Sequence, residues 1–201
     1  NDRSRIVRSI SQEDGSRVFQ LNDLEEANPW LARARSNLQV MYRTALAVSQ
    51  TLDIDRLLRR IMDLIFEWVE ADRGCIMLVD GPGGELKPKV RRTRSASPSD
   101  EKITISKTIL DYVMEKNQGV LTSDAREDAR WDSTASILQA GVREAICVPM
   151  QGRYDVVGVI YIDTSTSPQE IVRQKAPKFN EDHLKLMIAI AHQAALAVED
   201  T

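Results

Sequence analysis

The chain has 201 residues, of which 42% are hydrophobic and 28% are charged, with a formal net charge of -3. This composition is globular and long enough for one domain of about 150 residues with extensions. The charge gives no electrostatic reason to expect nucleic acid or an anionic membrane as a partner. Cys75 and Cys147 lie in apolar runs, and no apolar run approaches the roughly 18 residues that span a bilayer, so we expect a cytoplasmic protein without a disulfide framework.

The first part of the chain is polar. Residues 1–29 are predicted to be an interdomain linker, and the start at Asn1 rather than Met suggests an excerpt from a longer protein. Residues 30–53 are predicted to form an N-terminal signalling and dimerisation helix. Pro29 marks its start, since proline is tolerated in a first helical turn. Its apolar residues recur at alternating steps of three and four, as in a coiled coil. An amphipathic helix that lies on its own domain remains the alternative.

The rest of the chain, residues 54–201, is predicted to form the folded domain. Asp53 has the side chain of an N-cap and precedes a second amphipathic helix that ends near the "EADRG" stretch. The period then changes, and "GCIMLVD", "GPGG" and "ELKPKVRRT" are predicted to be a buried strand, its turn and a returning strand. The proline within the returning strand favours an edge of the sheet.

The second half of the domain begins with a helix that Ser106 caps, followed by a short strand in "GVLTSDA" and a brief helix around residues 133–139. A hairpin follows, in which "AICVPM" and "VVGVIYID" flank the turn "QGRYD". Both runs are apolar on both sides of the pleat, so they must be covered on both faces. After a long loop, Asn180 caps a closing helix with a second three-four pattern of apolar residues.

These elements predict an α+β domain built around a mostly antiparallel sheet. The two terminal helices carry more apolar surface than one sheet face requires, so we predict a homodimer in which they pair with their copies. The residues predicted for this interface are Leu31, Leu38, Met41, Ala45 and Val48 in the first helix and Met187, Ala191, Ala194 and Val198 in the last.

The chain resembles the GAF domain over about residues 36–200. The GAF domain is a small-molecule sensor and dimerisation module related in architecture to PAS domains. The resemblance rests on five stretches in the correct order, namely "TLDIDRLLRRIMDLIFEWVEADRGCIMLVD", "ISKTILDYVMEKNQGVLTSDA", "GVREAICVPM", "VVGVIYID" and "FNEDHLKLMIAIAHQAALAVED". The stretch "SRIVRSISQEDGSRVFQL" also resembles the segment that follows a forkhead-associated domain in bacterial multidomain regulators.

The resemblance implies a sheet of about six strands, with the N- and C-terminal helices on one face and a ligand pocket on the other. It implies that the hairpin lies at the centre of the sheet. It also implies a non-catalytic sensory domain of a bacterial regulator, which binds an unknown small molecule and passes the signal through its terminal helices to an output domain. The segments that line the pocket in the family predict these ligand-binding residues: Thr93, Asp124, Trp131, Arg143, Cys147 and Tyr161.

Two other functions remain as alternatives. The first is a ligandless dimerisation spacer. The second is a thiol-based methionine sulfoxide reductase, because one branch related to GAF domains reduces free methionine sulfoxide with cysteines. Against this alternative, no His, Lys or helix start adjoins Cys75 or Cys147 in sequence to lower a thiol pKa. His183 and His192 lie nine residues apart, which does not match helix-borne metal ligands. We therefore expect no enzymatic activity, no cofactor and no metal site.

Overall fold

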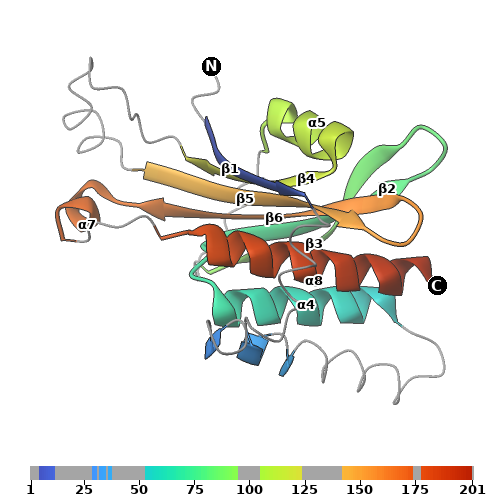
Figure 1. Cartoon of the computed structure of the whole chain (residues 1–201), viewed down its shortest axis with the longest axis horizontal. Coiled ribbons are helices and arrows are strands. Elements are labelled where there is room, and N and C mark those ends of the chain that lie inside the picture. The colour runs from blue at the N-terminus through green and yellow to red at the C-terminus, as the bar shows by residue number, and fades with distance from the viewer. Residues whose placement is uncertain are drawn as a thin grey trace.

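The computed structural model describes residues 5–11, 29–30, 32–34, 36–37, 53–94, 105–123, 142–173 and 178–200. Among these residues, a six-stranded sheet lies between one helix on one face and two helices on the other (Figure 1). The strands, in their order across the sheet, are β1 (Arg5–Ser11), β4 (Gln118–Ser123), β5 (Val142–Gln151), β6 (Val156–Thr166), β2 (Arg73–Asp80) and β3 (Glu85–Thr93).

All the paired strands are antiparallel. Helices α4 (Ile54–Trp68) and α8 (Glu181–Glu199) cover one face of the sheet, and α5 (Lys107–Lys116) covers the other (Figure 1). A short helix, α7 (Pro168–Arg173), follows β6. The predicted α+β class and the placement of helices from both ends of the domain on one face are confirmed.

Three predicted N-caps set the starts of the long helices. The side chains of Asp53, Ser106 and Asn180 each accept a hydrogen bond from the backbone N–H three residues later, at 3.3, 3.4 and 3.0 Å. Each bond satisfies a donor that the first helical turn would otherwise leave unpaired. The helix starts are therefore encoded locally, in the residue types at these positions.

The hairpin of β5 and β6 occupies the centre of the sheet, as the resemblance implied. On β6, Ile160 and Ile162 are buried in the core beneath α4 and α8, whereas Val159 and Tyr161 are buried in a second core beneath α5. Successive side chains of a strand point to opposite faces. The unbroken apolar run therefore reflects burial on both sides.

The apolar residues of α8 are covered by the chain itself. Met187, Ala191 and Ala194 are each 0% exposed within the single chain, where they belong to the core that α4, α8 and the sheet share. Val198 is half-buried against that core. The structure thus corrects the predicted interface for Met187, Ala191 and Ala194, which have no exposed surface to offer to a second copy. Val198 keeps part of its surface.

The seam predicted in the first helix, Leu31, Leu38, Met41, Ala45 and Val48, lies outside the described residues.

Part of the predicted linker belongs to the sheet. Arg5–Ser11 forms the edge strand β1 and pairs with β4. Ile10 packs against the main core, and Arg8 forms an ion pair with Glu181 at the start of α8, at 2.9 Å. Residues 5–11 therefore pair with the sheet of the domain, and most of them are exposed, so this strand contains few apolar residues.

The described residues between 29 and 37 are helical and pack through Trp30. Its ring meets Trp68 of α4 edge to face at 5.8 Å between centroids and His183 of α8 at 5.4 Å. The Nδ1 atom of His183 also accepts a hydrogen bond from the backbone N–H of Asn180, at 3.1 Å. This bond requires an unprotonated Nδ1, so the packing of Trp30 is coupled to a neutral His183.

We expect the free energy of unfolding to fall between pH 7 and pH 5 more in the wild type than in His183→Gln. Burial lowers the pKa of His183, although Asp182 and Glu70 oppose the shift. A lowered histidine pKa gives stability that is present above the unfolded value of about 6.5 and is lost as the pH falls through the folded pKa. Glutamine preserves a capping box with Asn180 and does not titrate. Urea titrations at both pH values measure the difference, and equal losses would contradict it.

Candidate functional site

Five side chains on the α5 face of the sheet form two neighbouring rows across the strands. Cys75 on β2, Tyr161 on β6 and Cys147 on β5 are register partners in the first row. Arg73 and Asp163 are partners in the second row. Register partners in neighbouring strands point to the same face, so this face combines charged, phenolic and thiol groups.

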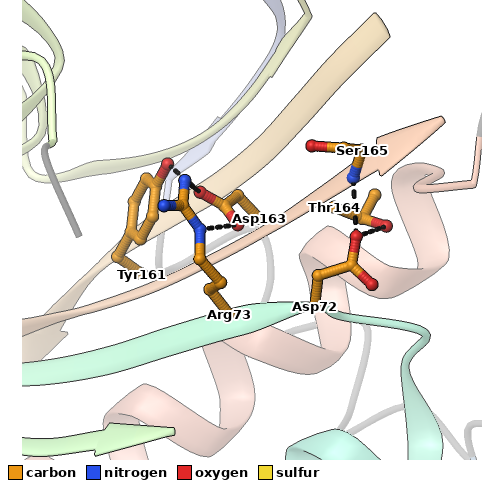
Figure 2. Close-up of polar contacts among 6 residues, drawn as sticks. All are labelled: Asp72, Arg73, Tyr161, Asp163, Thr164 and Ser165. Carbon is orange, nitrogen blue, oxygen red and sulfur yellow. Dashed lines mark hydrogen bonds and ion pairs between the residues drawn. The ribbon is translucent and has the colours of Figure 1, made fainter. Parts of the chain in front are cut away.

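The central feature of this face is a buried ionic cluster of Arg73, Asp163 and Tyr161 (Figure 2). The Nε and Nη2 atoms of Arg73 donate to the two carboxylate oxygens of Asp163 at 3.0 and 2.5 Å. The hydroxyl of Tyr161 donates to Asp163 Oδ2 at 2.9 Å. Asp163 is only 1% exposed. A buried carboxylate needs such a full set of donors, and a bidentate arginine is the strongest of them.

Tyr161 is held in its neutral form. Burial raises the pKa of its hydroxyl above the ordinary range, and the nearby Asp163 raises the pKa further. A phenol that stays protonated can donate a hydrogen bond but does not act as a base at neutral pH. The cluster therefore fixes geometry and charge on the same face of the sheet that α5 packs against.

A second carboxylate ties the end of β6 to the loop before β2 (Figure 2). Asp72 accepts hydrogen bonds from the hydroxyl of Thr164 at 3.2 Å and from the backbone N–H of Ser165 at 2.8 Å. Its own backbone N–H donates to the carbonyl oxygen of Asp163 at 2.8 Å. These bonds from Asp72 fix the backbone of β6 at Asp163 and at the two residues after it.

The structure places four of the six predicted ligand-binding residues on this same face. Cys147 and Tyr161 are register partners near its centre, and both are buried. Thr93 is the register partner of Arg73 and is exposed. Arg143 is exposed and lies near the start of β5, four residues before Cys147. Asp124 and Trp131 lie outside the described residues.

The sequence analysis missed Arg73 and Asp163, the charged pair of the cluster. Each stands at the end of an apolar run, Arg73 just before "GCIMLVD" and Asp163 at the close of "VVGVIYID". When the strand pairing is unknown, a charged residue at the end of an apolar run is most simply interpreted as a solvent-exposed residue at the end of a strand. Only the antiparallel pairing of β2 with β6 makes them partners.

The two thiols are poorly suited to redox or nucleophilic chemistry. Burial raises the pKa of Cys75 to about 12 and raises that of Cys147 further. Strand β6 lies between β2 and β5, so their Cα atoms are about 9 to 10 Å apart, beyond the ~7 Å limit for a disulfide. Their register positions therefore support the interpretation of both cysteines as small apolar residues.

We expect neither cysteine to react with iodoacetamide at pH 8 while the protein is folded. With a pKa near 12, about one Cys75 thiol in ten thousand is ionised at that pH. Mass spectrometry after timed alkylation checks this, with the urea-unfolded protein as the control in which both thiols react. Rapid single labelling of the folded protein would contradict the assignment and reopen the reductase alternative.

Two further observations limit the kinds of site that the described residues can form. No three of their His, Cys, Asp and Glu side chains are grouped closely enough to hold a metal ion. In the same parts of the chain, no helix combines the length and the apolarity that crossing a bilayer requires.

Comparison with known proteins decides the family. The family model described as the GAF domain matches residues 53–198, which are most of the chain. The chain belongs to the GAF domain family. Curated protein sequences provide no match to it.

Solved structures, GAF domains among them, have a similar fold. A GAF domain/HD domain protein from Geobacter sulfurreducens aligns with a TM-score of 0.53 at 17% identity, covering 74% of this chain and 93% of the other. GAF3 from Slr1393 of Synechocystis, in its photoproduct state, aligns with a TM-score of 0.52 at 13% identity, with coverages of 74% and 94%. A segment of a methyl-accepting chemotaxis protein aligns with a TM-score of 0.50 at 14% identity, with coverages of 78% and 94%. At these identities the likeness is one of fold.

Proposed function

We propose that this GAF domain is a non-catalytic sensory module that binds a small molecule on the α5 face of its sheet. The observation that carries the proposal is the cluster of Arg73, Asp163 and Tyr161, a set of fixed polar groups beside the apolar side chains that pack against α5. Ligand sites are typically apolar with a few precisely placed polar groups. The same face carries Thr93 and Arg143, which are exposed.

The proposed output is a change in the terminal helices, passed to an output domain of a cytoplasmic signalling protein. Structures with the same fold include a photoreceptor domain in a photoproduct state and a chemotaxis protein, which supports a sensory role. Ligand binding would shift the population between two arrangements of the layers, provided that the ligand binds one of them more tightly. The homodimer is retained in this proposal through the predicted seam of the first helix only.

A second candidate, the ligandless spacer, is favoured by one observation. Every oxygen of the Asp163 carboxylate already has a donor within the chain. A buried charge that is fully paired does not require a ligand to complete it. In this reading the cluster only stabilises the sheet, and the domain sets distance and orientation.

Thermal-shift measurements against a panel of nucleotides, amino acids and organic acids separate these two functions. A ligand at a hundredfold excess over its dissociation constant stabilises the folded state by about 2.7 kcal/mol. Arg143→Met, on the proposed ligand face, should reduce the shift. Arg59→Met is the matched control, since Arg59 is exposed on α4 beneath the opposite face. A panel without any shift favours the spacer, and equal losses in both variants would contradict the proposed face.

A further inference from the structure

The sheet separates α5 from α8, yet polar contacts join the two layers at the β5–β6 turn. On the α5 side, Asn117 follows the last residue of the helix with a left-handed backbone, φ 51°. Its side-chain nitrogen donates to the side-chain oxygen of Gln151 at 2.5 Å. Gln151 is the last residue of β5, so the end of α5 is bonded directly to the end of a central strand.

The same Gln151 is bonded to α8 through its backbone. A hydrogen bond of 2.7 Å joins the Nδ1 atom of His192, on α8, to the carbonyl oxygen of Gln151. Because a carbonyl oxygen can only accept, Nδ1 of His192 carries the proton. Gln151 is thus hydrogen-bonded to the end of α5 through its side chain and to α8 through its backbone carbonyl.

A second contact fixes the turn to the end of α8. The carboxylate of Glu199 accepts hydrogen bonds from the backbone N–H groups of Arg153 and Tyr154, at 2.8 and 3.1 Å. These backbone bonds lower the pKa of Glu199 and keep it ionised. Gly152 makes the approach possible, because a Cβ at that position would lie 2.1 Å from Glu199 Oε1. The end of β5 and the turn after it are therefore hydrogen-bonded to α8 at two residues, His192 and Glu199.

We propose that Gln151 couples the two faces of this domain, so that a displacement of α5 is transmitted through the β5–β6 turn to the C-terminal half of α8. The path runs from Asn117 to Gln151, and then to His192 and, through the turn backbone, to Glu199. These contacts are all made within the chain itself. The link to a signal rests on the proposed function, in which the ligand lies beneath α5.

Hydrogen exchange on the ligand-free protein tests the coupling by itself. Asn117→Gly removes the side-chain donor and keeps the left-handed backbone, which glycine adopts without strain. We expect backbone amides of residues 192–199 to exchange about fivefold faster than in the wild type, with the amides of α4 as the internal reference. A fivefold increase is what the loss of about one net hydrogen bond gives. Gln151→Met should give at least this increase, because it also removes the bond from the Gln151 side-chain nitrogen to the carbonyl oxygen of Gly152. The double variant should exchange no faster than Gln151→Met alone, since both substitutions remove the same bond between Asn117 and Gln151.

Gln118→Ala is the matched control. Its side chain accepts hydrogen bonds from Tyr112 of α5 and Ser9 of β1 and reaches neither the β5–β6 turn nor α8 in the described contacts. This variant should leave the exchange of residues 192–199 unchanged relative to α4. Unchanged exchange in Asn117→Gly, or the same increase in Gln118→Ala, would overturn the coupling. Because no ligand is present, this result is independent of whether the proposed ligand site exists.

Discussion

Replacing Asp163 by asparagine is expected to lower the free energy of unfolding by about 3 kcal/mol. Removal of one partner of a buried ion pair typically costs ~3 to 5 kcal/mol, because the remaining charge is left without compensation. Here the remaining charge is Arg73, whose side chain is 16% exposed and can recover some hydration, so the lower end of the range applies. Tyr161 would also lose a charged acceptor.

Asp63→Asn is the matched control for this prediction. Asp63 on α4 pairs with Arg92 at the surface, where the two side chains are 67% and 41% exposed. An exposed pair contributes at most about 1 kcal/mol. Urea denaturation of both variants at pH 7 measures the contrast. A loss below about 1 kcal/mol in Asp163→Asn would show that the cluster does not stabilise the fold.

Replacing Gly158 by alanine is expected to cost about 3 kcal/mol as well. Gly158 on β6 lies opposite Leu78 on β2 and Met150 on β5, between two paired strands. A Cβ there would lie 2.2 Å from the backbone oxygen of Met77. Overpacking typically costs about 1 to 3 kcal/mol, and the upper end applies because a strand backbone, unlike a side-chain tip, cannot rotate away.

Gly83→Ala provides the comparison, since a Cβ at Gly83 would meet nothing within 4 Å. This turn variant should leave the free energy of unfolding within about 0.5 kcal/mol of the wild type. Thermal melts followed by circular dichroism compare the two alanine variants directly. If Gly158→Ala has the same melting temperature as the wild type, the close approach of β6 to β2 is not present in solution.

The sequence was sufficient to predict the elements that carry local signals. The caps at Asp53, Ser106 and Asn180 and the turn after β2 depend on residue types within a few positions of one another, and each is confirmed. The central place of the β5–β6 hairpin was implied by the resemblance to GAF domains, and its apolar character on both faces agrees with that place. Such features need no knowledge of distant partners.

Features that depend on long-range pairing were not predictable in the same way. The strand β1 is short and mostly exposed, so its sequence lacks the apolar alternation that marks a half-buried strand. The alanine-rich pattern of α8 fits a helix–helix seam and a close contact with a sheet equally well, and the structure shows the second. Periodicity identifies a buried face but does not say what covers it.

The candidate site shows the same division. Tyr161 and Cys147 were predicted from the family segments, and the register places them side by side. The partners of the buried charge, Arg73 and Asp163, lie 90 residues apart, so only the pairing of β2 with β6 brings them together. The bridging role of Gln151 likewise depends on Asn117 and His192, which no local pattern connects.

Protein-observed NMR with the same panel of nucleotides, amino acids and organic acids tests the central claim most directly. If the α5 face binds a small molecule, the backbone signals of Arg73, Tyr161 and Asp163 and those of α5 will shift together in a saturable way. Signals on the solvent-facing side of α4 will stay in place. Shifts confined to α4 and α8, or none with any compound of the panel, would contradict the claim that this face of the sheet is a ligand-binding surface.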